Sequence, residues 1–144
     1  MPRTQVTAQE RQLIVERAHG RCEYCRSPVN FATQSFSVEH IIPVSRGGET
    51  ILDNLALACP GCNGHKYTKI EAADPADGAI IPLYNPRTQR WRAHFNWNED
   101  FTRIIGLTPT GRATVNALQM NRPGVMNMRR VLFASGLHPP ADDE

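Results

Sequence analysis

The sequence has no long hydrophobic run, and no apolar stretch approaches the roughly 18 residues that a membrane span requires. The opening segment, MPRTQVTAQE, lacks the apolar core of a secretory signal peptide. The formal net charge is only +2, so overall charge does not identify a nucleic-acid-binding protein. Lysine is scarce, with Lys66 and Lys69 alone, and the arginines that replace it suit bidentate contact with phosphate. From these absences we expect a soluble, cytoplasmic protein with no membrane partner.

The four cysteines leave no unpaired cysteine, because they form two Cys-x-x-Cys motifs. These are Cys22 with Cys25 and Cys59 with Cys62, separated by residues 26–58. In a chain that we expect to be intracellular, such a pair favours a tetrahedral structural zinc over disulfides. The alternatives are a redox motif or four buried thiols. A redox motif normally occurs once, on a βαβ pattern that is not evident here.

The first half of the chain carries signals for two helices around a strand. Thr7 and Glu10 have the spacing of a capping box, which predicts a helix over residues 8–19. Residues 36–42 are typical of a strand and residues 45–50 of a loop. Residues 51–57 lead into the second cysteine motif. Pro60 suits the first position of a helix that we predict over residues 60–71.

The second half carries a hairpin pattern followed by two helices. Residues 72–78 indicate a linker or turn. Aromatic and polar residues alternate over residues 90–97, which predicts a strand, and residues 101–107 can return as its partner. Helices are predicted over residues 109–120 and 123–136. Arg90 and Arg92 lie on the polar face of the predicted strand, where they either contact phosphate or are simply solvated.

A group of polar residues lies between and after the cysteine motifs. The chain reads Glu39-His40-Ile41-Ile42-Pro43, Gly47-Gly48, Asn54-Leu55, and Cys59 through Lys66. This order of motifs resembles the HNH nuclease family of the ββα-metal superfamily. The family pattern is an acidic residue or histidine before His-Ile-x-Pro, then a Gly-Gly loop, Asn-Leu, and Cys-x-x-Cys followed by Asn or His, two further residues and Lys. The resemblance covers about residues 20–70, half of the chain.

The resemblance implies a role for each of these residues. His40 is the expected general base, since a histidine accepts a proton near neutral pH. Glu39 and Asn63 are the expected oxygen ligands of a catalytic Mg²⁺ or Mn²⁺. Asn54 corresponds to the middle asparagine of the family, where it either orients His40 or braces the loop through backbone hydrogen bonds.

The chain departs from the family pattern at two positions. Glu39 stands where Asp or His is common, so the ligand is one methylene longer. Asn63 stands where His is common, and His65 follows two residues later. Residues two apart on a helix point roughly 200° apart, so both cannot serve one ion. We favour Asn63, with His65 as the alternative ligand or as a phosphate contact.

The same residues also allow less specific interpretations. Glu39 could pair with Arg46, His40 could be a satisfied core histidine, and Asn54 could be only a turn residue. Lys66 shares a helix face with Asn63 and is a candidate phosphate contact, as is Arg46.

We therefore expect an α+β protein in which residues 1–72 form an HNH ββα-metal core stapled by a Cys₄ zinc and preceded by a helix. Residues 73–144 add a β-hairpin and two helices that pack on this core in one compact unit. The resemblance implies an endonuclease that hydrolyses DNA by a one-metal mechanism, leaving a 5′-phosphate and a 3′-hydroxyl. RNA is a second expected substrate class. The alternative is a zinc-stapled nucleic-acid-binding module that does not cut.

Overall fold

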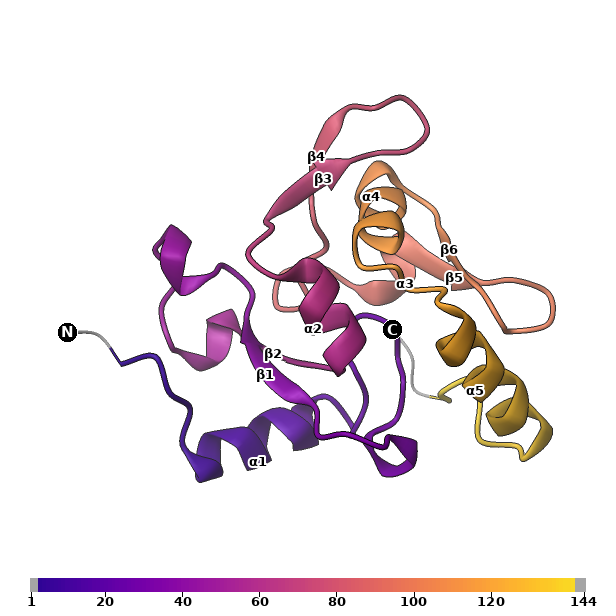
Figure 1. Cartoon of the computed structure of the whole chain (residues 1–144), viewed down its shortest axis with the longest axis horizontal. Helices are drawn as coiled ribbons and strands as arrows, with labels where there is room; N and C mark the ends of the chain where they lie inside the picture. Colours follow the sequence, from indigo (N-terminus) through magenta and orange to yellow (C-terminus); the bar gives the residue numbers. More distant parts are fainter. Residues whose placement is uncertain (1–2, 142–144) are drawn as a thin grey trace. The chain divides into compact units, whose positions relative to one another are not determined.

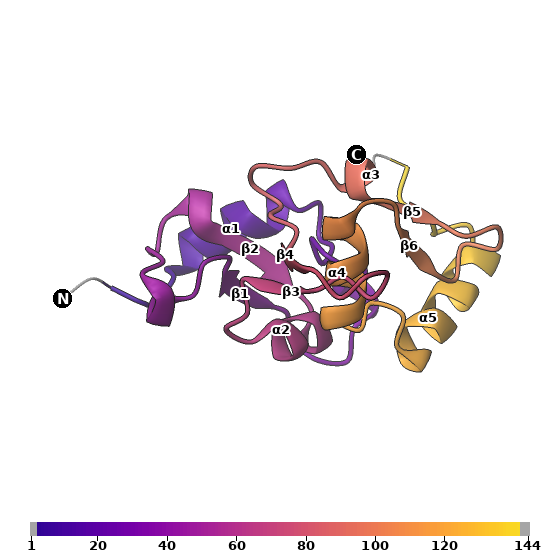
Figure 2. The ribbon, with the colours of Figure 1, turned by 90° about the horizontal axis from the view of Figure 1, so that it is seen from above.

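The computed structural model of the protein describes residues 3–141 and divides the chain into two compact units. The first unit runs to Ile70 and also includes Asn85–Arg87. The second unit consists of Glu71–Tyr84 and the chain from Thr88 onward. Both are drawn in Figure 1 and Figure 2. Within residues 3–141, no helix combines the length and apolar character that crossing a membrane would demand.

The first unit is built around a two-stranded hairpin that lies between two helices (Figure 1, Figure 2). Its elements are α1 (Ala8–Arg17), β1 (Ser37–His40), β2 (Leu55–Ala58) and α2 (Pro60–Lys66), with short 3₁₀ turns at Val29–Phe31, Val44–Arg46 and Leu52–Asn54. The strands are antiparallel, and the register pairs Ser37 with Ala58 and His40 with Leu55. All four residues of β2 are fully buried, so this strand is the centre of the core.

The capping box predicted at the start of α1 is present. Thr7 Oγ1 accepts a hydrogen bond from the Glu10 amide at 3.1 Å, and the Glu10 side chain accepts one from the Thr7 amide at 3.0 Å. These two bonds satisfy amides that have no partner within the helix. Arg17, in the last turn, donates to the carbonyls of Leu52 and Leu55, which joins α1 to the start of β2.

In its described part, up to residue 141, the second unit contains two hairpins and three helices. The hairpins pair β3 (Glu71–Ala73) with β4 (Ile80–Pro82) and β5 (Phe95–Trp97) with β6 (Ile104–Gly106). The helices are α3 (Trp91–His94), α4 (Pro109–Ala117) and α5 (Pro123–Ala134). Its core is aromatic, with the rings of Trp91 and Phe95 5.1 Å apart between centroids.

The predicted α+β class is confirmed, with the hairpin core and the N-terminal helix in their expected places. The turn predicted as one alternative for residues 72–78 is present, because residues 75–77 turn the chain between β3 and β4. Two local predictions are wrong. Residues 91–94 form a helical turn instead of a strand; Ala93 is exposed, whereas Trp91 and Phe95, at helical spacing, are both buried. Helix α2 ends at Lys66, where Tyr67 takes a positive φ of 49°.

Candidate active site and metal centre

The four cysteines meet at one point in the first unit. Cys22 and Cys25 lie in the turn after α1, Cys59 caps α2, and Cys62 lies in the first turn of that helix. Their Sγ atoms all lie within 4.8 Å of one another, and all four residues are buried. The Cys25 and Cys59 sulfurs are 3.6 Å apart and no disulfide joins them. A tetrahedron with Zn–S bonds of about 2.3 Å has sulfur edges of about 3.8 Å, so the cluster fits a structural zinc.

Hydrogen bonds of Glu23 fix the first cysteine motif relative to the hairpin, and a further bond lies within the second motif. The Glu23 amide donates to the Leu57 carbonyl at 2.9 Å, and the Leu57 amide donates to Glu23 Oε2 at 2.8 Å. The Cys62 amide donates to Cys59 Sγ at 3.4 Å, which favours a thiolate there. Burial raises the pKa of the Cys22 thiol well above its usual range. Because the thiolate is the ligand form, a bound cation is needed to hold this buried group deprotonated.

Glu39 faces the interior, where both of its carboxylate oxygens are already engaged. Lys66 Nζ lies 3.1 Å from Oε2, and the Tyr24 hydroxyl donates to Oε1. The same Nζ donates to the Ile41 carbonyl at 2.8 Å. The side chains of Glu39 and Lys66 are 4% and 2% exposed. Lys66 therefore lies in the core and attaches α2 to β1, and it does not reach the surface as the expected phosphate contact requires.

The surroundings of Glu39 bear on its expected role as a metal ligand. Burial raises the pKa of the Glu39 carboxyl, and the Lys66 charge opposes that shift. Burial also raises the pKa of Tyr24, so the phenol keeps its proton and donates it. A carboxylate that is nearly inaccessible and neutralised by an ammonium does not fit a cation site in this arrangement, because the cation would first have to displace Lys66.

His40 points to the other face of β1. The register runs without a bulge from Glu39, opposite Ala56, to His40, opposite Leu55. Neighbouring side chains of a strand project to opposite sides, so the structure does not bring the Glu39 carboxylate and the His40 imidazole together. His40 is half-buried, so a substrate can reach its imidazole. The buried Glu39 carboxylate is not accessible in this way.

The hydrogen bonds of Thr50 determine which nitrogen of His40 carries the proton. Thr50 Oγ1 lies 2.9 Å from His40 Nε2 and 2.7 Å from the Arg3 carbonyl oxygen. A carbonyl can only accept, so the single hydroxyl proton goes to Arg3. The Thr50 oxygen must then accept the proton of His40 Nε2. In the neutral imidazole this assigns the lone pair to Nδ1, to which no described residue forms a hydrogen bond.

The protonation state of His40 follows from its environment. Burial lowers the pKa of His40, and the nearby Lys66 charge lowers it further. The ordinary pKa of histidine is about 6.5, so the imidazole is mostly neutral at pH 7. A neutral imidazole with a defined free nitrogen can accept a proton from water.

Asn54 braces the loop that follows β1. Its Oδ1 accepts from the Ile42 amide at 2.9 Å, while Nδ2 donates to the carbonyls of Ile42 at 3.0 Å and Glu49 at 2.9 Å. Of the two roles predicted for Asn54, these contacts match the bracing of the loop. Gly48 belongs to the same loop and lies very close to Ile42. A Cβ at Gly48 would lie 1.7 Å from the Ile42 carbonyl oxygen.

The remaining predicted site residues lie on α2, in the loop or in the second unit. Asn63 is half-buried and His65 is exposed, both on α2. Arg46 is exposed, and its Nε donates to the Thr68 carbonyl at 2.8 Å, which joins the loop to the segment after α2. Arg90 and Arg92 are exposed in the second unit.

Sequence reasoning missed three residues that the structure places in this site. Tyr24 binds Glu39, and Thr50 binds His40. The third residue, Glu23, binds the amide of Leu57. Tyr24 and Glu23 lie between two metal-ligand cysteines, a position that gave a usable signal. Thr50 gave none, because a lone threonine in a loop is ordinary.

The hairpin, the helix packed on it and the four-cysteine centre define a zinc-knuckle ββα domain. Residues 22–69, one third of the chain, match the family model described as HNH endonuclease. The match confirms, for this segment, the resemblance to an HNH domain that the sequence shows. Such a domain indicates a nuclease or nucleic-acid-binding protein. Comparisons with curated proteins and with solved structures find no match to the chain.

Proposed function

We propose that the protein is an endonuclease that hydrolyses phosphodiester bonds of DNA. The observation that carries this proposal is the half-buried His40 of the HNH motif, whose Nε2 proton is held by Thr50. The geometry supports Nδ1 as the atom that accepts the proton of the attacking water. The water oxygen then bonds to phosphorus as the bond to the 3′-oxygen breaks. The released 3′-oxygen takes a proton from solvent, which gives a 5′-phosphate and a 3′-hydroxyl.

Other residues of the motif position this base. Asn54 holds the carbonyl and amide of Ile42, two residues after His40. Arg46, exposed in the same loop, is the proposed phosphate contact. His65, exposed on α2, is a second one. Arg46 and His65 can stabilise negative charge at the phosphate.

A divalent cation, Mg²⁺ or Mn²⁺, is part of this proposal as the group that would stabilise negative charge on the phosphate. Asn63 is the proposed neutral oxygen ligand, with His65 as the alternative. Glu39 can join them only if Lys66 releases its carboxylate.

The buried pair of Glu39 and Lys66 also favours a second candidate function. If Lys66 never releases Glu39, the domain is a zinc-stapled module that binds nucleic acid without cutting it. Both candidates involve a nucleic-acid partner, with DNA first and RNA second, and Arg90 and Arg92 as proposed contacts. They differ in whether phosphodiester bonds are broken.

Plasmid cleavage distinguishes the two candidates. Supercoiled DNA is incubated with the wild type and with His40→Ala, each with Mg²⁺, with Mn²⁺ and with EDTA. The proposal expects nicked or linear DNA from the wild type and a rate lower by about 10²–10⁴-fold from His40→Ala. Equal rates from both proteins would remove His40 from its role. Tight DNA binding without cleavage under all conditions would favour the second candidate, the module that binds nucleic acid without cutting it.

A further inference from the structure

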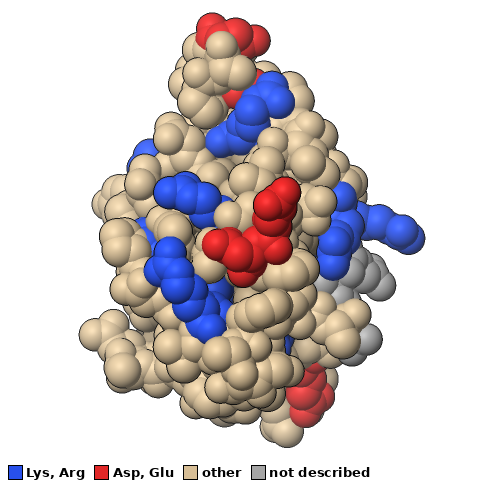
Figure 3. Space-filling model, turned by 90° about the vertical axis from the view of Figure 1, so that its right-hand side faces the viewer, with Lys and Arg blue, Asp and Glu red and all other residues tan. Residues whose placement is uncertain are grey.

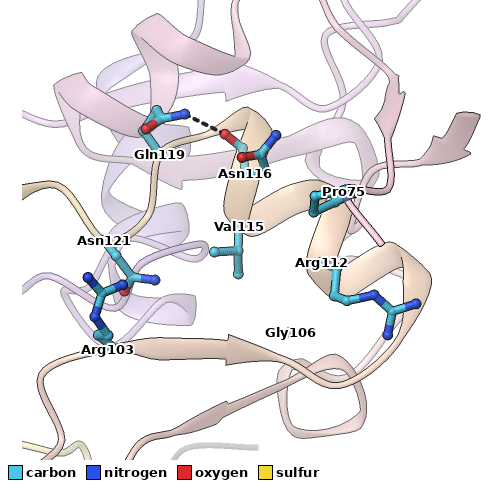
Figure 4. Close-up of a pocket in the computed structure, with 8 residues that line it drawn as sticks. All are labelled: Pro75, Arg103, Gly106, Arg112, Val115, Asn116, Gln119 and Asn121. Carbon is cyan, nitrogen blue, oxygen red and sulfur yellow. Dashed lines mark hydrogen bonds between the residues drawn. The ribbon is translucent and has the colours of Figure 1, made fainter. Parts of the chain in front are cut away.

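The second unit contains an open groove of about 340 Å³ that none of the motifs above accounts for. It is bounded by α4, by β6 and by the segment after α4, with Pro75 of the β3–β4 turn at its edge. Figure 4 shows Arg103 and Arg112 at opposite ends of the groove, with Val115 between them. Asn116, Gln119, Asn121 and Gly106 complete its lining.

Close approach of two backbones creates the floor of this groove. A Cβ at Gly106 would lie 2.4 Å from the Arg112 amide nitrogen, and one at Gly111 would lie 2.1 Å from the His94 carbonyl oxygen. The strand and the helix can approach this closely only because both positions are glycine. The main chain of β6 and α4 therefore sets the shape of the groove.

The two arginines differ in how far they are already engaged. Arg112 donates from Nε and Nη2 to the buried Asp74 carboxylate at 3.0 and 2.8 Å, so its charge is compensated and its orientation fixed. Asp77 adds further negative charge near Arg112. The guanidinium of Arg103 is exposed, and no described residue forms a hydrogen bond or an ion pair with it. Arg103 is therefore the uncompensated cation of the groove.

Carboxamides supply the remaining polar groups. Asn121 is committed to the fold, since it binds the amide and the carbonyl of Ile104 at 2.8 and 2.9 Å. Gln119 donates to the Asn116 carbonyl at 2.7 Å, which leaves its Oε1 as an acceptor. The Asn116 side chain is exposed on α4. Among the described residues that line the groove, none is a carboxylate.

This combination favours an anionic, polar ligand. Only Pro75 and Val115 offer apolar side chains, which is too little to hold a hydrophobic molecule. A guanidinium beside carboxamides that can both donate and accept suits a phosphate with an adjoining sugar or base edge. On the face that Figure 3 presents, basic side chains lie on either side of a central acidic group.

We propose that this groove binds one segment of a nucleic-acid strand, with Arg103 on a phosphate and Asn116 on the neighbouring sugar or base. The inference rests on the proposed nucleic-acid substrate and adds a contact site in the second unit. The ligand chemistry is that of a phosphodiester. A free mononucleotide also carries a phosphate, a sugar and a base, and the experiment therefore includes a mononucleotide as competitor.

Fluorescence anisotropy with a labelled DNA duplex tests the groove in a His40→Ala background, which separates binding from cleavage. Arg103→Ala is expected to weaken binding at least about fivefold and to reduce the slope of log K against log[salt] by about one. Asn116→Asp places a carboxylate in the groove and is expected to weaken binding to a similar extent. Both residues are exposed, so the thermal unfolding temperature should not change.

Two variants on α5 serve as controls matched in charge. Arg130→Ala removes one positive charge and Asn127→Asp adds one negative charge, and both residues are exposed outside the groove. These variants are expected to bind the duplex like the parent protein. If the groove variants and the controls bind equally, the groove is not a nucleic-acid contact.

Two further outcomes separate this inference from the proposed function. If the wild type cuts plasmid while Arg103→Ala binds duplex as tightly as the parent, the endonuclease stands and the groove proposal is overturned. Displacement of the duplex by an equal concentration of mononucleotide would reassign the groove to a small nucleotide and would also overturn it. The proposal is supported if the groove variants bind the duplex more weakly than the parent protein while the control variants bind it as tightly as the parent.

Discussion

Lys66 Nζ lies 3.1 Å from Glu39 Oε2, and the two side chains are 2% and 4% exposed. This buried ion pair joins α2 to β1 and links the knuckle helix to the strand that carries the HNH histidine. It also determines whether the carboxylate of the motif is available to a cation. The same contact therefore affects both the stability of the first unit and the proposed binding of a cation by Glu39.

Breaking this pair on one side should destabilise the first unit strongly. Lys66→Met leaves Glu39 buried without its partner, and the loss of one partner of a buried pair typically costs about 3–5 kcal/mol. Chemical denaturation should show this loss, whereas Lys69→Met, which removes an exposed lysine, should change stability little. The double variant Glu39→Gln with Lys66→Met should recover much of the loss. An unchanged midpoint in Lys66→Met would show that the pair is not formed.

The same substitution should increase the affinity for a divalent cation. In the wild type, a cation at Glu39 must displace the ammonium, whereas in Lys66→Met it meets an uncompensated carboxylate. Calorimetric titration with Mn²⁺ should therefore show binding about ten- to a hundredfold tighter in Lys66→Met. Glu39→Gln in the same background should abolish the gain. Equal affinities in the wild type and Lys66→Met would exclude competition between Lys66 and the cation.

Thr50 should control the activity of His40 through its tautomer. Thr50→Val keeps the side-chain shape but removes the acceptor for the Nε2 proton, so cleavage should slow by roughly ten- to a hundredfold. Thr50→Ser restores the hydroxyl and should restore the rate. The ¹⁵N shifts of the His40 ring should show an Nε2-protonated imidazole in the wild type and a mixture of tautomers in Thr50→Val. Identical spectra in the two proteins would contradict the assignment.

The pH dependence of cleavage should report His40. Burial and the Lys66 charge lower the pKa of His40, so its neutral, active form persists to lower pH than for an exposed histidine. The rate should be high above this pKa and fall as the pH drops through it, with the midpoint below about 6.5. A midpoint clearly above 6.5 in the log rate against pH would argue against His40 as the base.

Chelation of zinc should unfold the first unit. Elemental analysis should give one zinc per chain, and removal of the metal should abolish the cooperative thermal transition of this unit, since metal binding supplies folding free energy here. Cys62→Ser should lose zinc. Ser27→Ala is the matched control, because Ser27 Oγ lies 3.1 Å from Cys25 Sγ without being a ligand. Full zinc retention in Cys62→Ser would contradict the four-cysteine centre.

Much of this arrangement was predictable from local sequence patterns. The capping box at Thr7, the spacing of the cysteine motifs and Pro60 at a helix start each act within a few residues, so the pattern and the structure coincide. Of the strand predicted over residues 90–97, only β5 (Phe95–Trp97) is present, and residues 91–94 form a helical turn for the opposite reason. There the packing of Trp91 against Phe95 and Trp97 outweighs a period-two pattern that a helical turn also accommodates.

The amino-acid sequence by itself determined the HNH motif, the four cysteines of the metal centre and the order of the core elements, because these follow from residue type and spacing. Only the tertiary structure decided the partners of the charged and polar groups. It joined Glu39 to Lys66 and Tyr24, set Thr50 between His40 and Arg3, and turned Asn54 toward the loop backbone. A buried polar group binds whichever complementary atom folding places beside it, and that atom often lies dozens of residues away along the chain.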